Sequence, residues 1–426
     1  MKKFFIKTLG CKTNQLESAI LEEKMEKAGY VSVADYKECD IFILNSCSVT
    51  QNSDNESLRL INHVKNFNEK IFTVLTGCFA QLSYKELSKN SNIDLLLGND
   101  DKFNIVEHIN NKESCVTDIM DIKNFNTQNL ENLNRTRANL KIQDGCNNRC
   151  SYCTIPLARG YSRSNSIENI INQIEILSKN DFKEIILTGI HIGQWGEDFS
   201  PKLKLLNLLE KIETTNIVRY RLGSLNPLEI DMVLLEFLKN SEKFCPHFHL
   251  SLQSANNKIL KLMNRQYTTE KYLEQIKHIN TIFKNPFLGC DIIVGFPNET
   301  DEDFEITYNN LKNSGLSKIH VFPYSKRPNT VAYKMDNQVN EKDKKLRSEK
   351  LKELSDILYM NFVNSNINTN QEVIFQKRFD KNGYLKGLTR NYMNIIVKNN
   401  DKKYLNTLSN VKIKEIENSQ IIGEII

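Results

Sequence analysis

Apolar residues in the first 120 positions alternate between short continuous runs and helical spacing. The runs at residues 3–9, 40–44, 71–75 and 94–97 have the length of buried strands, and residues 15–28 carry apolar side chains at helical intervals up to Gly29. Strands and helices that alternate with short connections predict a parallel sheet. We therefore expect an α/β fold that begins with an open parallel-sheet domain over residues 1–120.

The alternation resumes, with longer helices, after a polar stretch. Residues 121–137 are rich in Asn and lack an apolar period, which predicts a linker. Six strands are expected beyond it, at 138–142, 184–187, 218–222, 248–252, 289–294 and 318–322, with helices between them and a sixth helix at 342–360. Six βα units over residues 138–366 predict a partial TIM-like (β/α)6 barrel, whose chemistry belongs at the carboxyl ends of its strands. The charged run 342–353 is expected to be a solvent-exposed helix face.

Residues 367–426 have a different pattern. Short apolar runs separated by Asn, Gly and Asp predict a small C-terminal β-barrel. From Gln371 onward the chain has ten Lys and Arg against six Asp and Glu. These basic residues interleave with Phe379, Tyr384, Tyr392 and Tyr404, a combination that suits phosphate contact and base stacking. A generic β-domain with a basic surface is the alternative, because so small a charge excess arises on ordinary surfaces.

Composition places the chain in the globular class and narrows its setting. Of its 426 residues 40% are apolar and 26% are charged, and its net charge is +5. The N-terminus lacks the apolar core of a signal peptide, and no stretch reaches the 18 or so apolar residues of a membrane span. We expect a cytoplasmic protein without membrane partners. Ten cysteines in a reducing compartment then favour metal ligation, catalysis or packing over disulfides.

Three cysteines form a C-x3-C-x2-C pattern directly after the first barrel strand. Cys146, Cys150 and Cys153 lie in one polar loop, so they can surround one metal centre. A cluster of four irons takes four ligands, so three cysteines leave one iron open to another ligand. A structural zinc site would instead recruit a fourth side chain. The pattern favours a 4Fe-4S cluster with one open iron, and structural zinc remains the alternative.

Three further cysteines each follow a strand of the N-terminal sheet. Cys11, Cys47 and Cys78 come just past the ends of successive long strands, where ligands of open α/β sheets collect. Parallel strands place these ends at one edge, so the sequence predicts a second metal cluster there. Three buried packing cysteines are the alternative. The other cysteines share no such position and are interpreted as packing residues: Cys39, Cys115, Cys245 and Cys290.

Small and hydroxylated residues follow the other expected barrel strands. Gly189 follows the second strand, Ser224 the third, and Gln253 and Ser254 the fourth. Such residues suit a ribose and an amino-acid moiety, and a glycine lets a ligand approach the backbone closely. Each alone is also what an ordinary turn contains.

Several motifs together resemble one known family over nearly the whole chain. The aromatic residue before the last cysteine of the loop, Tyr152, is typical of radical S-adenosylmethionine (SAM) enzymes. The motifs are similar to those of the radical SAM methylthiotransferases, and the Gly-Cys-Lys-x-Asn-Gln opening is similar to that of the MtaB-like branch. They are Thr8-Leu9-Gly10-Cys11-Lys12-Thr13-Asn14-Gln15, Asn45-Ser46-Cys47-Ser48-Val49-Thr50, Thr76-Gly77-Cys78-Phe79-Ala80-Gln81, and the stretches 143–160, 246–254, 291–299 and 321–325.

The resemblance implies a cofactor set. Cys146, Cys150 and Cys153 would hold a 4Fe-4S cluster whose open iron binds SAM and cleaves it to a 5′-deoxyadenosyl radical. Cys11, Cys47 and Cys78 would hold a second 4Fe-4S cluster that carries a methylated sulfur, with the methyl group taken from a second SAM. The implied SAM contacts are Tyr152, Gly189, Ser224, Gln253, Ser254 and Asp291.

The resemblance also implies a reaction and a partner. The methylthio group would go to C2 of N6-threonylcarbamoyladenosine at position 37 of tRNA, next to the anticodon, with the base flipped out between the clusters. No general base is needed, so we name no catalytic side chain. The C-terminal barrel would correspond to the RNA-binding TRAM domain, and an unidentified protein would donate electrons. The alternatives are the same chemistry on isopentenyladenosine in tRNA or on a ribosomal protein, and a non-enzymatic, zinc-holding RNA-binding protein.

Overall fold

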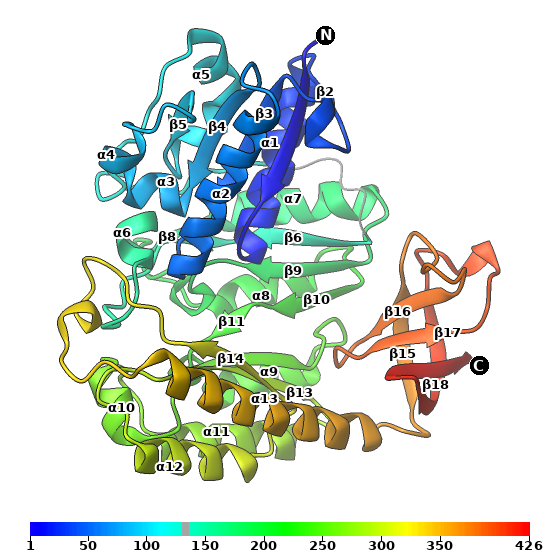
Figure 1. Ribbon diagram of the computed structural model, residues 1–426. Helices are drawn as coiled ribbons and strands as arrows, with labels where there is room; N and C mark the ends of the chain where they lie inside the picture. The colour runs from blue at the N-terminus through cyan, green and yellow to red at the C-terminus, as the bar shows by residue number, and fades with distance from the viewer. Residues whose placement is uncertain (130–135) are drawn as a thin grey trace.

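The N-terminal part of the chain is a parallel sheet covered by helices on both faces. The computed structural model describes residues 1–129 and 136–426, and Figure 1 shows this sheet in blue and cyan. Its strand order is β2-β1-β3-β4-β5. The strands are β1 (Lys3–Thr8), β2 (Val31–Ser32), β3 (Ile41–Ser46), β4 (Phe72–Gly77) and β5 (Leu95–Leu97). The expected open parallel sheet is confirmed, and β2 is an additional edge strand that the apolar pattern did not predict.

Both faces of this sheet are apolar because its strands are covered twice. Side chains of α1 (Lys12–Lys27) and α5 (Ile105–Asn111) form one core with alternate strand residues. Side chains of α2 (Gln51–Phe67), α3 (Cys78–Leu82) and α4 (Tyr84–Leu87) form a second core with the residues between them. Strands buried on two faces carry continuous apolar runs, which is the pattern seen in the sequence.

The six strands expected in the second segment are all present, within two residues of their predicted bounds. They form two parallel sheets, in the orders β10-β9-β6 and β11-β12-β13-β14. The short strand β11 (Ser224–Leu225) follows β10 directly and pairs with β12, so the ladder passes from one sheet to the other there. The main strands are β6 (Arg137–Lys141), β9 (Glu184–Thr188), β10 (Arg219–Leu222), β12 (His247–Gln253), β13 (Phe287–Val294) and β14 (Lys318–Pro323).

Helices pack on one side of these sheets around the largest apolar core of the molecule. The six expected helices are α7 (Ile167–Lys179), α8 (Leu205–Glu213), α9 (Met232–Asn240), α11 (Thr269–Ile282), α12 (Asp301–Lys312) and α13 (Glu341–Asn364). Two shorter helices, α6 (Ile155–Arg159) and α10 (Asn257–Leu262), follow the cysteine loop and β12. In the described part of the chain, no helix combines the length and the apolar run that a membrane span requires. The polar stretch 121–137 runs directly into β6, and residues 130–135 lie outside the described residues.

The expectation of a solvent-exposed face over residues 342–353 is wrong for part of that run. Lys344 and Arg347 are buried where α13 packs on β14 and α12. Arg347 donates to Glu299 at 2.7 Å and to Asp301 at 2.8 Å. A run of charges gave no sign of this packing, because both acceptors come from the preceding loop and helix.

The chain ends in a closed five-stranded barrel, as expected, coloured orange and red in Figure 1. Its strand order is β15-β16-β17-β19-β18. The strands are β15 (Asn370–Phe375), β16 (Leu385–Thr389), β17 (Asn394–Val397), β18 (Leu408–Glu417) and β19 (Gln420–Ile425). Of the four interleaved aromatic residues, Phe379, Tyr392 and Tyr404 pack against the barrel core, whereas Tyr384 is exposed.

The barrel is held to the second segment by two buried arginines of β10. Arg219 donates to the carbonyl oxygen of Leu388 at 3.0 Å, and Arg221 donates to that of Thr389 at 2.7 Å. Both guanidinium groups also bind Glu184 of β9, at 2.7 and 2.9 Å. Because these side chains are almost fully buried, the ion pair and the carbonyl contacts fix where the barrel sits.

Candidate metal centres and cofactor cavity

The cysteine loop lies between β7 (Gln143–Asp144) and α6, and backbone contacts fix its shape. Cys146 donates its N–H to Gly160 at 3.1 Å, and Cys153 donates to the carbonyl of Cys150 at 3.1 Å. Gly145 has φ +70°, and a Cβ there would lie 1.9 Å from the carbonyl oxygen of Tyr161. Only glycine fits, so the residue before the first cysteine is set by the fold. The three cysteines line one cavity of about 190 Å³.

Positive groups approach two of the three sulfur atoms. The Arg265 guanidinium donates to Cys150 Sγ at 3.2 Å, and His191 Nδ1 lies 3.5 Å from Cys146 Sγ. Burial lowers the pKa of His191, but the contacts with Cys146 and Glu229 outweigh it and raise this pKa to about 10. Burial raises the pKa of the Cys153 thiol to about 12. A bound metal ion removes the proton of such a thiol outright, and donors to the sulfur then tune the site.

Three of the six residues expected to contact SAM line the same cavity: Tyr152, Ser224 and Gln253. Gln253, the last residue of β12, has φ +74°, which is an unusual backbone conformation for a residue other than glycine. The other three are occupied elsewhere. Gly189 packs closely against Gln143, Ser254 is buried with its hydroxyl 3.4 Å from that of Thr307, and Asp291 pairs with His249 at 2.9 Å.

Arg265, His191 and Asn226 line the cavity and were not predicted. Arg265 lies between two helices, about a hundred residues from the cysteine loop, and no local pattern marks it. His191 lies three residues after the end of β9, beside Gly189, where a cofactor contact was expected.

The three N-terminal cysteines come together at the carboxyl edge of their sheet. Cys11 precedes α1, Cys47 follows β3, and Cys78 opens α3. Gly10 has φ +103°, and a Cβ there would lie 2.7 Å from Cys47 Cβ. The pKa of Cys47 is raised to about 11, by burial first and then by the neighbouring Cys78 and Cys11. Cys78 and Cys11 are therefore close enough to Cys47 to act on its charge.

Within the described residues, neither set of three cysteines is grouped like the ligands of a single metal ion. Among residues 1–129 and 136–426, no three His, Cys, Asp or Glu side chains are grouped so that they could hold a single metal ion. A four-iron cluster attaches each thiolate to a different iron, so its ligands stand farther apart than those of one zinc ion. Cys39, Cys245 and Cys290 are buried, in agreement with packing roles, and Cys115 donates to Asp101 at 3.2 Å.

A buried ionic network joins the two sets of cysteines. Arg159, at the end of the helix after the cysteine loop, binds Glu17 of α1 and Asp144. Lys102 and Lys141 also bind Glu17, at 2.5 and 2.8 Å. Asn99 of the N-terminal domain donates to Cys78 Sγ at 3.7 Å and to the carbonyl of Ala158 at 2.7 Å. One network therefore sets the position of both candidate clusters.

A second set of contacts joins the N-terminal domain to the segment that carries the cysteine loop. Arg327, after β14, donates to Asp54 of α2 and to the Ser48 hydroxyl, both at 2.6 Å. Ser48 directly follows Cys47, and its carbonyl accepts from Thr154, directly after Cys153, at 3.4 Å. The loops that carry the two cysteine sets thus touch each other.

Comparison with known proteins agrees with this arrangement. Residues 140–311 match the radical SAM superfamily, and residues 3–98 match a family described as uncharacterized protein family UPF0004. In fold, 78% of the chain is similar to 77% of the radical SAM methyltransferase TsrM from Kitasatospora setae, with TM-score 0.57 and 12% identity.

Curated relatives cover most of the chain. Threonylcarbamoyladenosine tRNA methylthiotransferase MtaB of Aquifex aeolicus is 40% identical over 83% of this chain and 87% of its own length. The protein of that name from Bacillus subtilis is 34% identical over 92% of this chain and 89% of its own length. A tRNA-2-methylthio-N6-dimethylallyladenosine synthase of Clostridium botulinum is 32% identical over 99% of this chain and 96% of its own length. The chain is an enzyme and belongs to the radical SAM methylthiotransferase family.

Proposed function

We propose that this enzyme transfers a methylthio group to C2 of N6-threonylcarbamoyladenosine at position 37 of tRNA. The observation that carries the proposal is the contact of the three-cysteine loop, through Thr154 and α6, with segments of the N-terminal domain that adjoin Cys47 and Cys78. The choice of nucleoside follows from the relatives named threonylcarbamoyladenosine tRNA methylthiotransferase MtaB, which are 34–40% identical to this chain. Because the chain belongs to a family of enzymes, the alternative of a non-enzymatic, zinc-holding protein is excluded.

Cys146, Cys150 and Cys153 would hold one 4Fe-4S cluster with an open iron, and Cys11, Cys47 and Cys78 would hold the second. Together with SAM these groups supply radical formation and the sulfur atom. In this proposal Tyr152, Ser224 and Gln253 contact SAM, because they line the cavity that the three loop cysteines open into. Gly189, Ser254 and Asp291 would instead hold the ends of the barrel strands next to this cavity in position, through the contacts described above.

The protein's own part is ligation, orientation and exclusion of water. Arg265 and His191 would stabilise the thiolates of Cys150 and Cys146 through their contacts with the sulfur atoms. The Glu17–Arg159 network would hold the two clusters across one space, into which the target base is flipped. No side chain is assigned as a general base.

The proposed domain boundaries are those expected from the sequence. Residues 1–120 carry the second cluster, 121–137 connect the domains, 138–366 form the radical SAM domain as a partial (β/α)6 barrel made of the two sheets, and 367–426 form the TRAM-like RNA-binding barrel. The enzyme would act on tRNA in the cytoplasm, with electrons from an unidentified donor.

An assay with defined RNA tests the function. The reconstituted enzyme is incubated with SAM, a reductant and anticodon stem-loops that carry threonylcarbamoyladenosine, isopentenyladenosine or unmodified adenosine. Mass spectrometry of the digested nucleosides is expected to show a methylthio product from the first RNA alone. Product from isopentenyladenosine alone would support the alternative substrate, and absence of product from both would overturn the proposal.

A further inference from the structure

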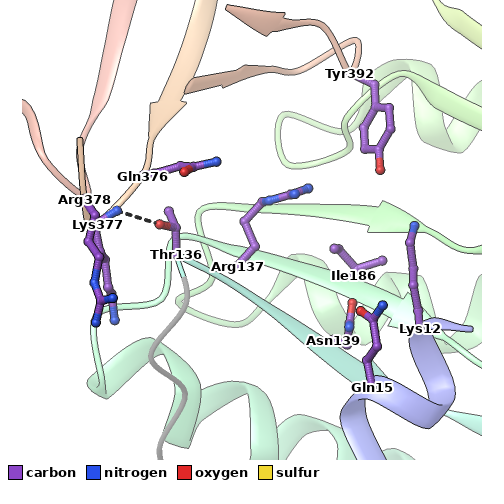
Figure 2. A pocket seen from close by; sticks show the side chains of 10 residues that line it. All are labelled: Lys12, Gln15, Thr136, Arg137, Asn139, Ile186, Gln376, Lys377, Arg378 and Tyr392. Atoms are coloured by element: carbon purple, nitrogen blue, oxygen red, sulfur yellow. Dashed lines mark hydrogen bonds between the residues drawn. The ribbon is translucent and has the colours of Figure 1, made fainter. Parts of the chain in front are cut away.

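A second cavity, of about 350 Å³, lies where α1, the β6–β9 sheet and the C-terminal barrel meet, as Figure 2 shows. Among residues 1–129 and 136–426, it shares no lining residue with the cavity of the cysteine loop. The residues that line it are Lys12, Gln15, Thr136, Arg137, Asn139, Ile186, Gln376, Lys377, Arg378 and Tyr392. Its volume suits a ligand group of amino-acid size.

Two cations of this cavity lack a full counter-charge. Within residues 1–129 and 136–426, Lys12 forms no ion pair, and its Nζ lies 5.9 Å from the centre of the Tyr392 ring. Arg137 reaches Glu184 only at 3.4 Å, and that carboxylate is already bound by two arginines at shorter distances. Figure 2 shows the Arg137 guanidinium in the middle of the cavity and the Lys12 side chain extending towards the Tyr392 hydroxyl. The cavity therefore has excess positive charge and suits an anion.

A buried histidine beside the cavity is consistent with that charge. The pKa of His247 is held well below its ordinary value, by burial first and then by the positive charges of Arg221 and Lys12. Its ring lies 4.1 Å from that of Tyr392. Lys12, which lines the cavity, is thus close enough to His247 to act on its charge.

The other walls offer partners for a small polar group with one apolar branch. Asn139 and Gln15 present amides, and Ile186 is an apolar floor between them and Arg137. A threonylcarbamoyl group carries one carboxylate, one hydroxyl, one methyl group and the N–H and C=O groups of a urea. Each of these has a counterpart in the cavity.

The place of the cavity fits the proposed reaction. Lys12 follows Cys11, a proposed ligand of the cluster that delivers sulfur to C2 of the base. In adenine only N1 separates C2 from C6, the atom that bears the N6 substituent. When C2 faces that cluster, the substituent is therefore directed to its immediate neighbourhood.

We propose that this cavity is the specificity pocket for the threonylcarbamoyl group, with Lys12 and Arg137 binding its carboxylate. The inference rests on the proposed function and names the residues that select the substrate. A dimethylallyl group, which some relatives' names specify, is a hydrocarbon and would leave both cations without a partner. A site with unpaired polar groups rejects such an analogue strongly.

Paired stem-loops test the pocket in the reconstituted holoenzyme. One RNA carries threonylcarbamoyladenosine, and the other carries the same group with its carboxylate replaced by a primary amide. Wild type is expected to favour the carboxylate in kcat/KM by about ten- to a hundredfold, the range for a charge-assisted hydrogen bond. Lys12→Met should remove most of this preference, and Lys12→Arg should retain most of it. Lys350→Met, at an exposed lysine of α13 outside the cavity, should leave the ratio unchanged.

The possible outcomes distinguish an error in the pocket assignment from an error in the proposed function. Equal losses on both RNAs in Lys12→Met would assign Lys12 to a backbone phosphate and overturn the inference, as would an unchanged ratio. Iron and sulfide content is measured for each variant, and if Lys12→Met loses the second cluster, Arg137→Met gives the same test away from Cys11. Wild type that modifies neither RNA would overturn the proposed function itself, whereas wild type that modifies both equally overturns only the pocket.

Discussion

Arg159 and Glu17 form a two-point ion pair between the domains that carry the two sets of cysteines. The Arg159 Nη1 and Nη2 atoms lie 2.8 and 3.0 Å from Glu17 Oε1 and Oε2. Both side chains are buried, and burial, which alone would raise the pKa of Glu17, is outweighed by Arg159, Lys102 and Lys141, so this pKa stays well below its usual range. The pair is planar and bidentate, a geometry that lysine cannot reproduce.

Arg159→Met should destabilise the protein strongly, because it leaves the Glu17 carboxylate buried with less counter-charge. The expected loss is about 3–5 kcal/mol in the free energy of unfolding, measured by urea denaturation. Arg159→Lys should recover only part of it. Lys398→Met is the matched control, because its pair with Glu417 is half-exposed and its loss should change stability far less than the loss of Arg159. Equal effects of Arg159→Met and Lys398→Met would contradict a central role of the pair.

Glu184 should make the docking of the C-terminal barrel sensitive to acid. Burial would raise its pKa, but Arg221 and Arg219 outweigh burial and lower it from 4.5 to about 2. A carboxyl group with a depressed pKa stabilises the folded state above its unfolded pKa, and that contribution is lost as the pH falls from about 4.5 to about 2. The contribution is about 3 kcal/mol at most.

The measurement is the urea midpoint from pH 6 to pH 3. Wild type should lose stability over this range more steeply than Glu184→Gln, which lacks the titrating group. Glu417→Gln, changed at an exposed carboxylate, should follow the wild-type slope. Parallel slopes for wild type and Glu184→Gln would show that another group dominates.

Iron and sulfide analysis should count two independent clusters. Anaerobically reconstituted wild type is expected to hold about eight irons, and a Cys146/Cys150/Cys153 triple alanine variant about four. If wild type instead held about four irons and the triple variant none, Cys11, Cys47 and Cys78 would be packing residues. Methylthio transfer would then have no sulfur carrier.

Single substitutions should separate the two halves of the reaction. Cys150→Ala should abolish SAM cleavage, measured as 5′-deoxyadenosine by chromatography. Cys47→Ala should leave SAM cleavage in place and stop formation of the methylthio nucleoside. Fully modified product from Cys47→Ala would contradict the assignment of a second cluster.

Much of the fold followed from the sequence because its strands are buried on both faces or pack on helices. Continuous apolar runs marked β1, β3 and β4, and the cysteines just past their ends were predicted to meet because parallel strands share one edge. β2 escaped prediction because two residues make no pattern. The three expected SAM contacts that line the cavity all lie in the cysteine loop or next to the ends of barrel strands.

The contacts between domains could not be predicted in this way. Glu17 lies on an amphipathic helix, where a charged residue is ordinarily solvent-exposed, and its partner Arg159 is 142 positions away. Hydrophobic periodicity assigns a residue to a face of its own element and carries no information about which distant element covers that face. Arg265 was missed for the same reason, since its role depends on where the segment between α10 and α11 meets the cysteine loop.

Three of the contacts that hold the C-terminal barrel go to its main chain, since Arg219 and Arg221 bind carbonyl oxygens of residues 388–390. Every amino acid carries the same carbonyl group, so these three contacts do not depend on which side chains occupy those positions. The proposed RNA-binding surface of the barrel can therefore change side chains during evolution while these main-chain contacts keep the barrel in place beside the β10 strand.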